Sequence, residues 1–318
     1  MGDVTHGPGD ASHAPPEHGG VVLVAGAGGM IGGALARRLV ADGRVVRRLV
    51  RGHPQGPDER VWDPAHGVLD PAVLERVTAV VHLGGASLAN GRWSGARRKA
   101  LATSRVASTM QIARAIAASA ERPRVLLVAS AVGIYGDRGE EWLDEKSPAG
   151  RGFLAELAVE WEAAARPAAA AGVRVVHPRF GLVLDPRGGA LPPLLRLARF
   201  GLGGPLGSGR QWWPWVTLDD VVRALVLALD DDHFEGPFLL AADVTRQRDL
   251  AATLGRLLRR PAWLPAPAFA LRIVLGGMAD EMLLASQRVR ARVLERARFR
   301  FEDPALEPAL RRMLVSPS

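Results

Sequence analysis

VVLVAGAGGMIGGALARRLVADGRVVRRLVR, from Val21 to Arg51, contains the strongest structural pattern of the chain. It begins with an uninterrupted apolar run, Val21 to Ala25, of the kind that forms a strand buried on both faces. A glycine-rich turn follows, and Ile31 to Val40 then shows the apolar spacing of a helix that ends at Asp42-Gly43. The sequence therefore predicts a strand, a glycine turn and a helix.

The glycines of this turn have the spacing of a dinucleotide-binding loop. Gly26 allows a tight turn, and Gly28 or Gly29 lets the backbone approach a pyrophosphate. Gly32 lets the helix pack close to the strand, and the helix N-terminus offers free N–H groups to the phosphates. The residues predicted to contact the cofactor here are Gly26, Gly28, Gly29, Met30, Ile31 and Gly32.

The end of the second predicted strand, Val45 to Val50, indicates which nucleotide binds. NAD sites place an acidic residue about 20 positions beyond the glycines, where it holds the ribose 2′-hydroxyl. This chain has Arg51 there, and its first carboxylate afterwards is Asp58. A guanidinium suits a 2′-phosphate as a charged, planar partner. The sequence therefore predicts NADP(H), although an Arg-rich chain can also carry an arginine at this place by chance.

Composition excludes several classes of protein. The chain has 318 residues, no cysteine and a net charge of +8 that comes almost entirely from arginine. We therefore expect neither a disulfide nor a thiolate metal site, and no metal is predicted. No basic run is interleaved with aromatic residues, so we expect no nucleic-acid partner. The polar segment 1–19 is predicted to be a disordered tail, and without a signal sequence or a long apolar stretch we expect a cytoplasmic protein with no membrane partner.

Strands and helices alternate through the first half of the chain, which predicts an α/β fold with a doubly wound parallel sheet. We expect an NADP-binding domain over 20–180, to which pieces of 210–245 return, and a smaller, mostly helical substrate lobe over 181–318. Apolar spacing predicts helices over 283–294 and 304–314. Ligands of such sheets lie at the carboxyl ends of the strands. This places further cofactor contacts at Leu83, Gly84, Gly85, Ala129 and Ser130.

Several motifs resemble the extended short-chain dehydrogenases/reductases. In chain order they are GAGGMIG, HLGG, SAVGIYG, PRFGLVL and LDDVVRALVLAL. RWSGARRKALATSRVAST (92–109), FLAELAVEWEAAA (153–165) and the segment 188–220 resemble more narrowly the atypical subgroup called "epimerase family protein", as does the C-terminal segment. The resemblance implies a Rossmann domain that binds NAD(P) and an oxidoreductase or epimerase activity.

The resemblance also implies a catalytic Tyr-x-x-x-Lys pair, which this chain lacks. Phe153 and Leu157 stand at the two positions, and neither side chain can transfer a proton. We name Tyr135, Ser130 and Glu145 as the candidates for a replacement. For Tyr135 a packing role, and for Glu145 a solvated loop position, stay open as alternatives.

The substrate side is predicted from the second half of the chain and from the subgroup's motifs. Arg92, Trp93, Gln211 and Trp215 are the candidate substrate contacts. The tryptophans after Gln211 can form a platform for a planar ligand or fill a core. Arg179 can hold an anionic group of the cofactor or substrate, or it can pair with a carboxylate.

Two functions of different class follow from these residues. The first is an NADP(H)-binding oxidoreductase or epimerase that acts on an unknown hydroxyl- or carbonyl-bearing small molecule through a nonstandard proton donor. The second is a non-catalytic NADPH-binding sensor or regulatory protein, which the missing Tyr and Lys favour. The Ala-rich helix predicted over 153–171 allows a homodimer, and its glutamates leave a monomer open.

Overall fold

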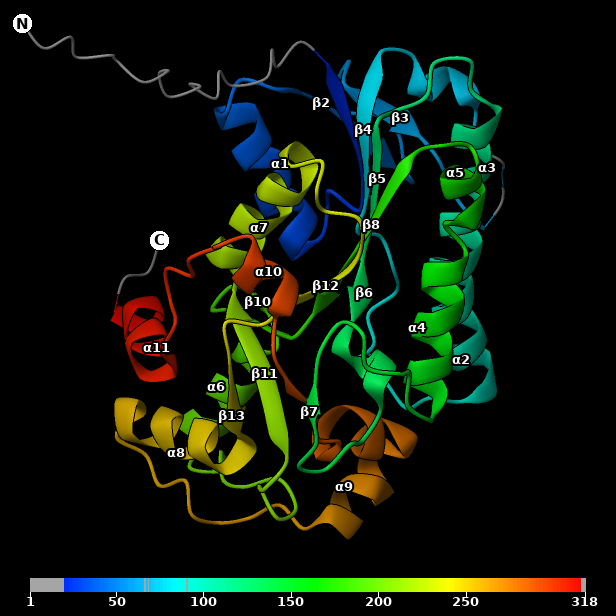
Figure 1. The fold of residues 1–318 in the computed structure, drawn as a ribbon. Helices are drawn as coiled ribbons and strands as arrows, with labels where there is room; N and C mark the ends of the chain where they lie inside the picture. Colours follow the sequence, from blue (N-terminus) through cyan, green and yellow to red (C-terminus); the bar gives the residue numbers. More distant parts are fainter. Residues whose placement is uncertain (1–19, 66, 68, 90, 316–318) are drawn as a thin grey trace, which may run out of the picture.

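The computed structural model describes residues 20–65, 67, 69–89 and 91–315, so the predicted tail 1–19 lies outside the described residues. Within this part of the chain, eight strands form one large sheet (Figure 1). Its strands are β1 Val21–Ala25, β2 Val45–Val50, β3 Glu59–Val61, β4 Val77–His82, β5 Val125–Val128, β6 Ser130–Ala131, β8 Arg174–Phe180 and β12 Gly236–Leu240. The order is β12-β8-β5-β4-β1-β2-β3, with β6 beside β8, and every pairing is parallel. The predicted doubly wound sheet is confirmed.

Helices cover both faces of this sheet because its strands are apolar on both sides. One face packs on helices α1 Met30–Ala41 and α7 Leu218–Asp230. The other face packs on α3 Ser108–Ala118, on α4 Phe153–Ala163 and on α5 Arg166–Ala170. Figure 1 shows the two layers on opposite sides of the sheet. The remaining helical segments before α6 are α2 Gly95–Ala102, η1 Pro71–Leu74, η2 Thr103–Ala107 and η3 Val132–Tyr135.

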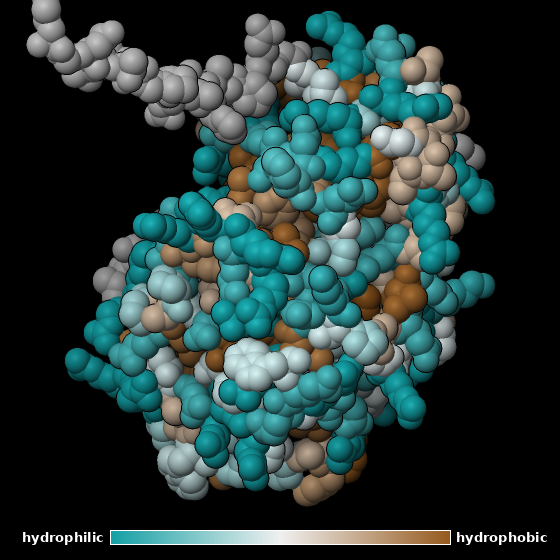
Figure 2. Space-filling model, viewed as in Figure 1, coloured by the Kyte–Doolittle hydropathy of each residue, from teal (hydrophilic) through white to brown (hydrophobic). Residues whose placement is uncertain are grey.

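The second half of the chain adds a smaller lobe. This lobe contains helices and also a four-stranded sheet, and the sequence did not predict that sheet. Its strands are β9 Leu182–Asp185, β10 Gly188–Gly189, β11 Trp212–Thr217 and β13 Asp243–Arg246. Its helices are α6 Leu191–Arg199, α8 Gln247–Leu258, α9 Ala268–Leu275 and α11 Leu306–Val315. Figure 2 shows that hydrophilic side chains cover most of the visible face of both lobes.

The helix predicted over 283–294 is wrong, whereas the one predicted over 304–314 is found as α11. The segment η4, Ala279–Leu284, ends where Ala285 becomes extended, and the short strand β14, Arg288–Val289, then pairs with β7, Trp142–Leu143. A new helix, α10, covers Arg292–Arg296. The apolar residues of this stretch pack into separate cores, so their helical spacing does not mark one continuous helix.

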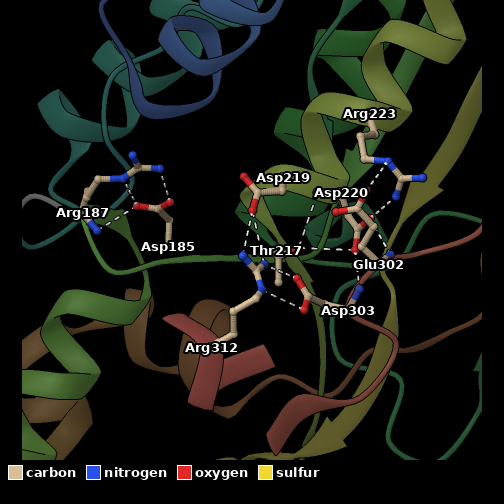
Figure 3. Close-up of polar contacts among 9 residues, drawn as sticks. All are labelled: Asp185, Arg187, Thr217, Asp219, Asp220, Arg223, Glu302, Asp303 and Arg312. Carbon is tan, nitrogen blue, oxygen red and sulfur yellow. Dashed lines mark hydrogen bonds and ion pairs between the residues drawn. The ribbon is translucent and has the colours of Figure 1, made fainter. Parts of the chain in front are cut away.

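The C-terminal segment is fastened to the N-terminal end of α7 by a buried carboxylate (Figure 3). Asp220 accepts hydrogen bonds from the backbone amides of Glu302 at 2.9 Å and Asp303 at 3.1 Å. It also accepts hydrogen bonds from the Arg223 guanidinium at 2.7 Å and from the Thr217 hydroxyl at 3.4 Å. Asp303 in turn pairs with Arg312 of α11. This network ties α11 to the helix that covers the large sheet.

Candidate functional site

The glycine turn after β1 has the geometry of a phosphate-binding loop. Gly26 has φ +89°, and a Cβ atom there would lie 2.6 Å from the amide nitrogen of Gly84. A Cβ atom on Gly32 would lie 2.2 Å from the carbonyl oxygen of Gly26. Gly28 and Gly29, by contrast, are exposed, and Gly28 has no atom within 4 Å of an added Cβ. Two positions therefore require glycine for close packing, and two leave open backbone at the start of α1, where an anion fits.

A hairpin of the smaller lobe lies against the start of α1. Added Cβ atoms on Gly188 and Gly189 of β10 would lie 3.0 Å from the Met30 side chain. The turn that precedes them is held by Arg187, which donates two side-chain hydrogen bonds to Asp185, at 2.8 and 3.0 Å (Figure 3). Ile31 is half-buried against the core of the large sheet. Met30 thus joins the two lobes beside the predicted phosphate site.

Arg51 is exposed just beyond β2 and makes no ion pair with any residue in the described ranges. Its two basic neighbours on β2 are engaged. Arg47 donates hydrogen bonds to the carbonyl oxygens of Val73 and Glu75, at 2.6 and 3.0 Å, and Arg48 lies 3.7 Å from the Glu59 carboxylate. Of the three arginines, Arg51 is therefore the one whose guanidinium is available to a ligand.

The backbone after β4 lies beside the glycine turn. Leu83 donates a backbone hydrogen bond to Ala25 at 2.9 Å, which places Gly84 beside the glycine turn. An added Cβ on Gly85 would lie 3.1 Å from the guanidinium carbon of Arg105. Arg105 is buried and donates a hydrogen bond to the carbonyl oxygen of Ala86 at 3.0 Å. Burial lowers its pKa to about 10.

The sequence offered no indication of Arg105, which supports the loop that carries three of the predicted cofactor contacts, Leu83, Gly84 and Gly85. It lies in the π-helical turn η2, and such turns often occur at functional sites. A π-helical turn holds one more residue than an α-helical turn, and the helical spacing of the sequence does not reveal it. No pattern in the sequence therefore indicated the role of Arg105.

His82 ends β4 and is 1% exposed. Its Nε2 atom lies 2.8 Å from the Ser108 hydroxyl oxygen, and that hydroxyl is within hydrogen-bond distance of two helix carbonyl oxygens. Burial and then the charge of Arg105 lower the pKa of His82 to about 4. Its Nδ1 atom has no hydrogen-bond partner among the described residues, and the ring carbon beside it lies 3.1 Å from a Cβ added to Gly84. His82 is thus a neutral histidine directly beneath the cofactor loop.

Three of the predicted site residues belong to one buried polar network. The Arg179 guanidinium pairs with both carboxylate oxygens of Glu162, at 2.8 and 2.9 Å. Ser130 donates its hydroxyl hydrogen to Glu162 at 2.6 Å. Arg179 also donates to the Tyr135 hydroxyl oxygen at 2.8 Å, and that hydroxyl donates to the carbonyl oxygen of Asp144 at 2.9 Å. The network joins α4, β6, β8 and η3.

This network favours the packing role that was the alternative for Tyr135 over a role as proton donor. Tyr135 is completely buried, and both directions of its hydroxyl are used within the protein. Burial raises its pKa to about 12, despite the neighbouring Arg179. The Ser130 hydroxyl is likewise buried and committed to Glu162, so neither group is free to exchange a proton with a bound substrate.

Glu145 is also a structural residue in this geometry. It is 7% exposed, and its Oε1 atom accepts hydrogen bonds from the backbone amides of Leu239 and Val293, at 3.2 and 3.1 Å. Leu239 lies on β12, the edge strand of the large sheet. Glu145 therefore pairs with a backbone amide at the edge of the sheet, and it is buried, unlike the solvated loop charge that was the alternative.

Apolar side chains fill the place where the wider superfamily has its catalytic pair. The Phe153 ring packs edge-on against Trp93 at 5.4 Å, and both belong to a cluster with Leu157. Trp93 is 8% exposed and donates its indole N–H to the carbonyl oxygen of Leu88 at 2.9 Å. Trp93 is therefore a core residue, whereas Arg92 is exposed beside Gly276.

Of the two alternatives left open for the tryptophans after Gln211, the structure shows core filling for Trp213 and Trp215. Trp215 is fully buried, and Gln211 donates its side-chain amide to the carbonyl oxygens of Leu206 and Leu283, at 3.1 and 2.8 Å. Alternation along β11 turns Trp215 into the core of the smaller lobe. Only Trp212 of this group reaches the surface in part, where the Arg246 guanidinium lies 3.9 Å from the centroid of its ring.

A cavity of about 260 Å³ opens beside the β6–η3 turn. Gly133 and Leu154 line it from the large lobe, and Glu281 and Arg272 line it from the C-terminal segment. Glu281 also accepts a hydrogen bond from the Leu154 backbone amide at 2.7 Å, at the start of α4. In the described residues no helix is long and apolar enough to cross a membrane, and no group of metal-ligating side chains is found.

Comparison with known proteins agrees with this architecture. Residues 22–238 match the model of the NAD dependent epimerase/dehydratase family, and residues 266–313 match a domain of unknown function, DUF1731. Epimerase family protein Mb2239 of Mycobacterium bovis is 43% identical over 292 residues, which cover 91% of this chain and 96% of the relative. Epimerase family protein SDR39U1 of Bos taurus is 36% identical over 299 residues, covering 92% of this chain and 99% of that relative.

Solved structures show the same likeness. The human epimerase family protein SDR39U1 (isoform 2), crystallised with NADPH, superposes with a TM-score of 0.84 at 32% identity, covering 93% of this chain and 99% of that one. UDP-glucuronic acid 4-epimerase from Bacillus cereus shares the fold with a TM-score of 0.73 at 16% identity, covering 91% and 96%. Both domain matches, the sequence relatives and the sheet topology agree: the chain belongs to the NAD dependent epimerase/dehydratase family, as an extended short-chain dehydrogenase/reductase of the epimerase family protein type.

Proposed function

We propose that the protein binds NADP(H) and uses it as an oxidoreductase or epimerase on a small molecule that carries a hydroxyl or carbonyl group. The observation that carries the proposal is the open glycine backbone at the start of α1 together with Arg51, the unpaired guanidinium beyond β2. The dipole and free amides of α1 suit a pyrophosphate, and Arg51 suits a 2′-phosphate. The human relative crystallised with NADPH supports the same choice of cofactor.

The chain's own residues would bind and orient the reactants. The nicotinamide, when bound, supplies a hydride acceptor or donor. Leu83 to Gly85 and Ala129 would provide backbone along the cofactor, and the cavity beside Gly133 would receive the substrate. Phe153 and Leu157 stand in place of the usual Tyr and Lys, and Tyr135 is buried in the core. The proton that accompanies hydride transfer would therefore come from water in this cavity.

Changing the charge of Arg51 tests the choice of cofactor. Arg51→Glu is expected to weaken NADPH binding by about tenfold or more, because an exposed ion pair is replaced by a repulsion, and to leave NADH binding nearly unchanged. Arg166→Glu, which changes an exposed arginine of α5, is the matched control and should alter the affinity for neither NADPH nor NADH. Titration calorimetry with each nucleotide gives the two constants. Equal losses for NADPH and NADH would refute the role of Arg51.

A second candidate function is a non-catalytic NADPH-binding protein. The observation that favours it is that Tyr135, Ser130 and Glu145 are all buried and hydrogen-bonded within the protein. C4-deuterated NADPH separates the two functions across a panel of ketones, enones and nucleotide sugars. Transfer of the label to a substrate establishes the oxidoreductase. Tight NADPH binding without transfer to any compound favours the sensor.

A further inference from the structure

Two segments of the smaller lobe, 191–210 and 256–277, expose an unusual number of large apolar side chains. Of the thirteen large hydrophobic residues that are exposed in the described chain, eight lie in these two segments. They are Leu197, Phe200, Leu202, Trp263, Leu264, Phe269, Ile273 and Val274. Phe200 is 77% exposed and Trp263 is 76% exposed, so these rings pack very little against the described part of the chain. We call the exposed parts of the two segments the α6–α9 surface.

The two segments run side by side. Arg260 donates a side-chain hydrogen bond to the carbonyl oxygen of Arg199 at 3.1 Å, and Leu206 forms a parallel bridge with Ala266. Helix α9 follows directly, and none of its eight residues is buried. Figure 1 places the chain between α8 and α9 along the lower end of the molecule, and Figure 2 shows tan and brown atoms at that lower edge. The apolar side chains therefore form one extended surface at the end opposite β2 and β3.

Charge distinguishes this surface from an ordinary apolar patch. The segments 191–210 and 256–277 contain seven arginines and neither aspartate nor glutamate. Arg256 and Arg272 pair with carboxylates from outside the segments. The other five make no ion pair with any described residue: Arg196, Arg199, Arg210, Arg259 and Arg260. Unpaired guanidinium groups thus lie among exposed aromatic and aliphatic side chains.

A second copy of the chain is a poor occupant for this surface. A two-fold dimer would place the same patch against itself and bring two sets of unpaired arginines together. Like charges with no carboxylate between them oppose such an interface. An occupant must instead offer apolar volume and negative charge together, and the surface of a bilayer with anionic lipids offers both.

We propose that the α6–α9 surface docks the protein on the surface of an anionic lipid bilayer. The rings of Trp263, Phe200 and Phe269 would enter the interface between head groups and acyl chains, and the unpaired arginines would contact lipid phosphates. Such a protein lies on the membrane and needs no spanning helix, which agrees with the helices found. The proposal departs from the sequence expectation of no membrane partner, because that expectation considered only long apolar stretches and signal sequences. It is independent of the proposed catalytic function.

Co-sedimentation of the full chain with vesicles tests the proposal. We expect binding to vesicles that contain phosphatidylglycerol, no binding to pure phosphatidylcholine, and weakening by salt. Arg259→Gln/Arg260→Gln should reduce partition by about 30-fold, at roughly 1 kcal/mol per arginine. Phe269→Ser/Ile273→Ser should reduce it at least about tenfold through lost apolar burial.

Matched controls lie on the other lobe. Val40→Ser/Val61→Ser removes two exposed apolar side chains, and Arg114→Gln/Arg166→Gln removes two exposed charges, and neither pair should change partition. NADPH affinity and the melting temperature of each variant report on its folding. Absence of binding to anionic vesicles would overturn the proposal. A dimer in sedimentation velocity that Phe269→Ser/Ile273→Ser dissociates would overturn it as well, because the α6–α9 surface would then be the contact between two copies of the chain. Equal losses in the control and test variants would also overturn it.

Discussion

Replacing Glu162 by Gln removes the negative charge from the buried network beneath β8. The change preserves side-chain shape and leaves the Arg179 guanidinium without its carboxylate partner. The side chains of the two residues are only 15% and 8% exposed, so water cannot restore the lost interaction. Removing one partner from a buried ion pair costs about 3–5 kcal/mol, because the remaining charge stays buried and uncompensated. We expect the free energy of unfolding to fall by that amount.

The pH dependence gives a second test of the same pair. Burial by itself raises the pKa of Glu162, but the hydrogen bonds and charge of Arg179 and the hydrogen bond from Ser130 together lower it below the ordinary value of 4.5. A folded-state pKa below the unfolded value means that ionised Glu162 stabilises the fold above about pH 4.5 and that this contribution is lost as the pH falls further. The acid limb of the stability curve should therefore be flatter in Glu162→Gln.

Urea denaturation followed by tryptophan fluorescence measures both effects. Glu160→Gln is the matched control, because Glu160 lies exposed on the same helix and its replacement should change the free energy of unfolding by less than about 0.5 kcal/mol. If Glu162→Gln is as stable as the control, or if its acid limb matches that of the unmodified protein, the buried pair does not hold the fold and the reasoning is refuted.

Three further variants test other parts of the structure. Gly32→Ala would put a methyl group against the Gly26 carbonyl oxygen. We therefore expect a loss of about 1–3 kcal/mol in the free energy of unfolding and weaker NADPH binding, measured by calorimetry. Gly95→Ala is the control and should change neither, because the space around Gly95 is open. His82 has its pKa lowered to about 4 from 6.5 by burial, so its neutral form contributes about 3 kcal/mol that is present above pH 6.5 and lost as the pH falls toward 4. Replacing it with Gln, which cannot titrate, should flatten the stability curve over that interval, and an unchanged slope would contradict the assignment. Asp220→Asn weakens a charge-assisted hydrogen bond to Arg223 and hydrogen bonds to two backbone amides. We expect the free energy of unfolding to fall by about 2–3 kcal/mol and proteolysis near residue 302 to become faster. Proteolysis as slow as in the parent chain would show that Asp220 does not hold the C-terminal segment in place.

Local patterns in the sequence were sufficient for the parallel, doubly wound type of the large sheet, although not for its short strands β3 and β6. The apolar strand Val21 to Ala25, the glycine turn and α1 are found as predicted, because a doubly buried strand and a tight turn each need particular residues in consecutive positions. The place of Arg51 just beyond β2 also follows from the sequence, whereas the engagement of Arg47 and Arg48 with other partners was visible only in the structure. Family membership is readable from the same motifs.

The tertiary structure alone decided what the polar residues of the site do. Tyr135, Ser130, Glu145 and Arg179 look alike in sequence as candidate catalytic or binding groups, yet packing buries all four, and hydrogen bonds commit them within the protein. The role of a polar side chain depends on which distant residues face it, and Glu162 reaches Arg179 only because α4 packs beside β8. The spacing of residues along the chain determines where a strand or a turn forms. The burial of a polar side chain and its hydrogen-bond partners depend instead on contacts between segments far apart in sequence, which no local pattern encodes.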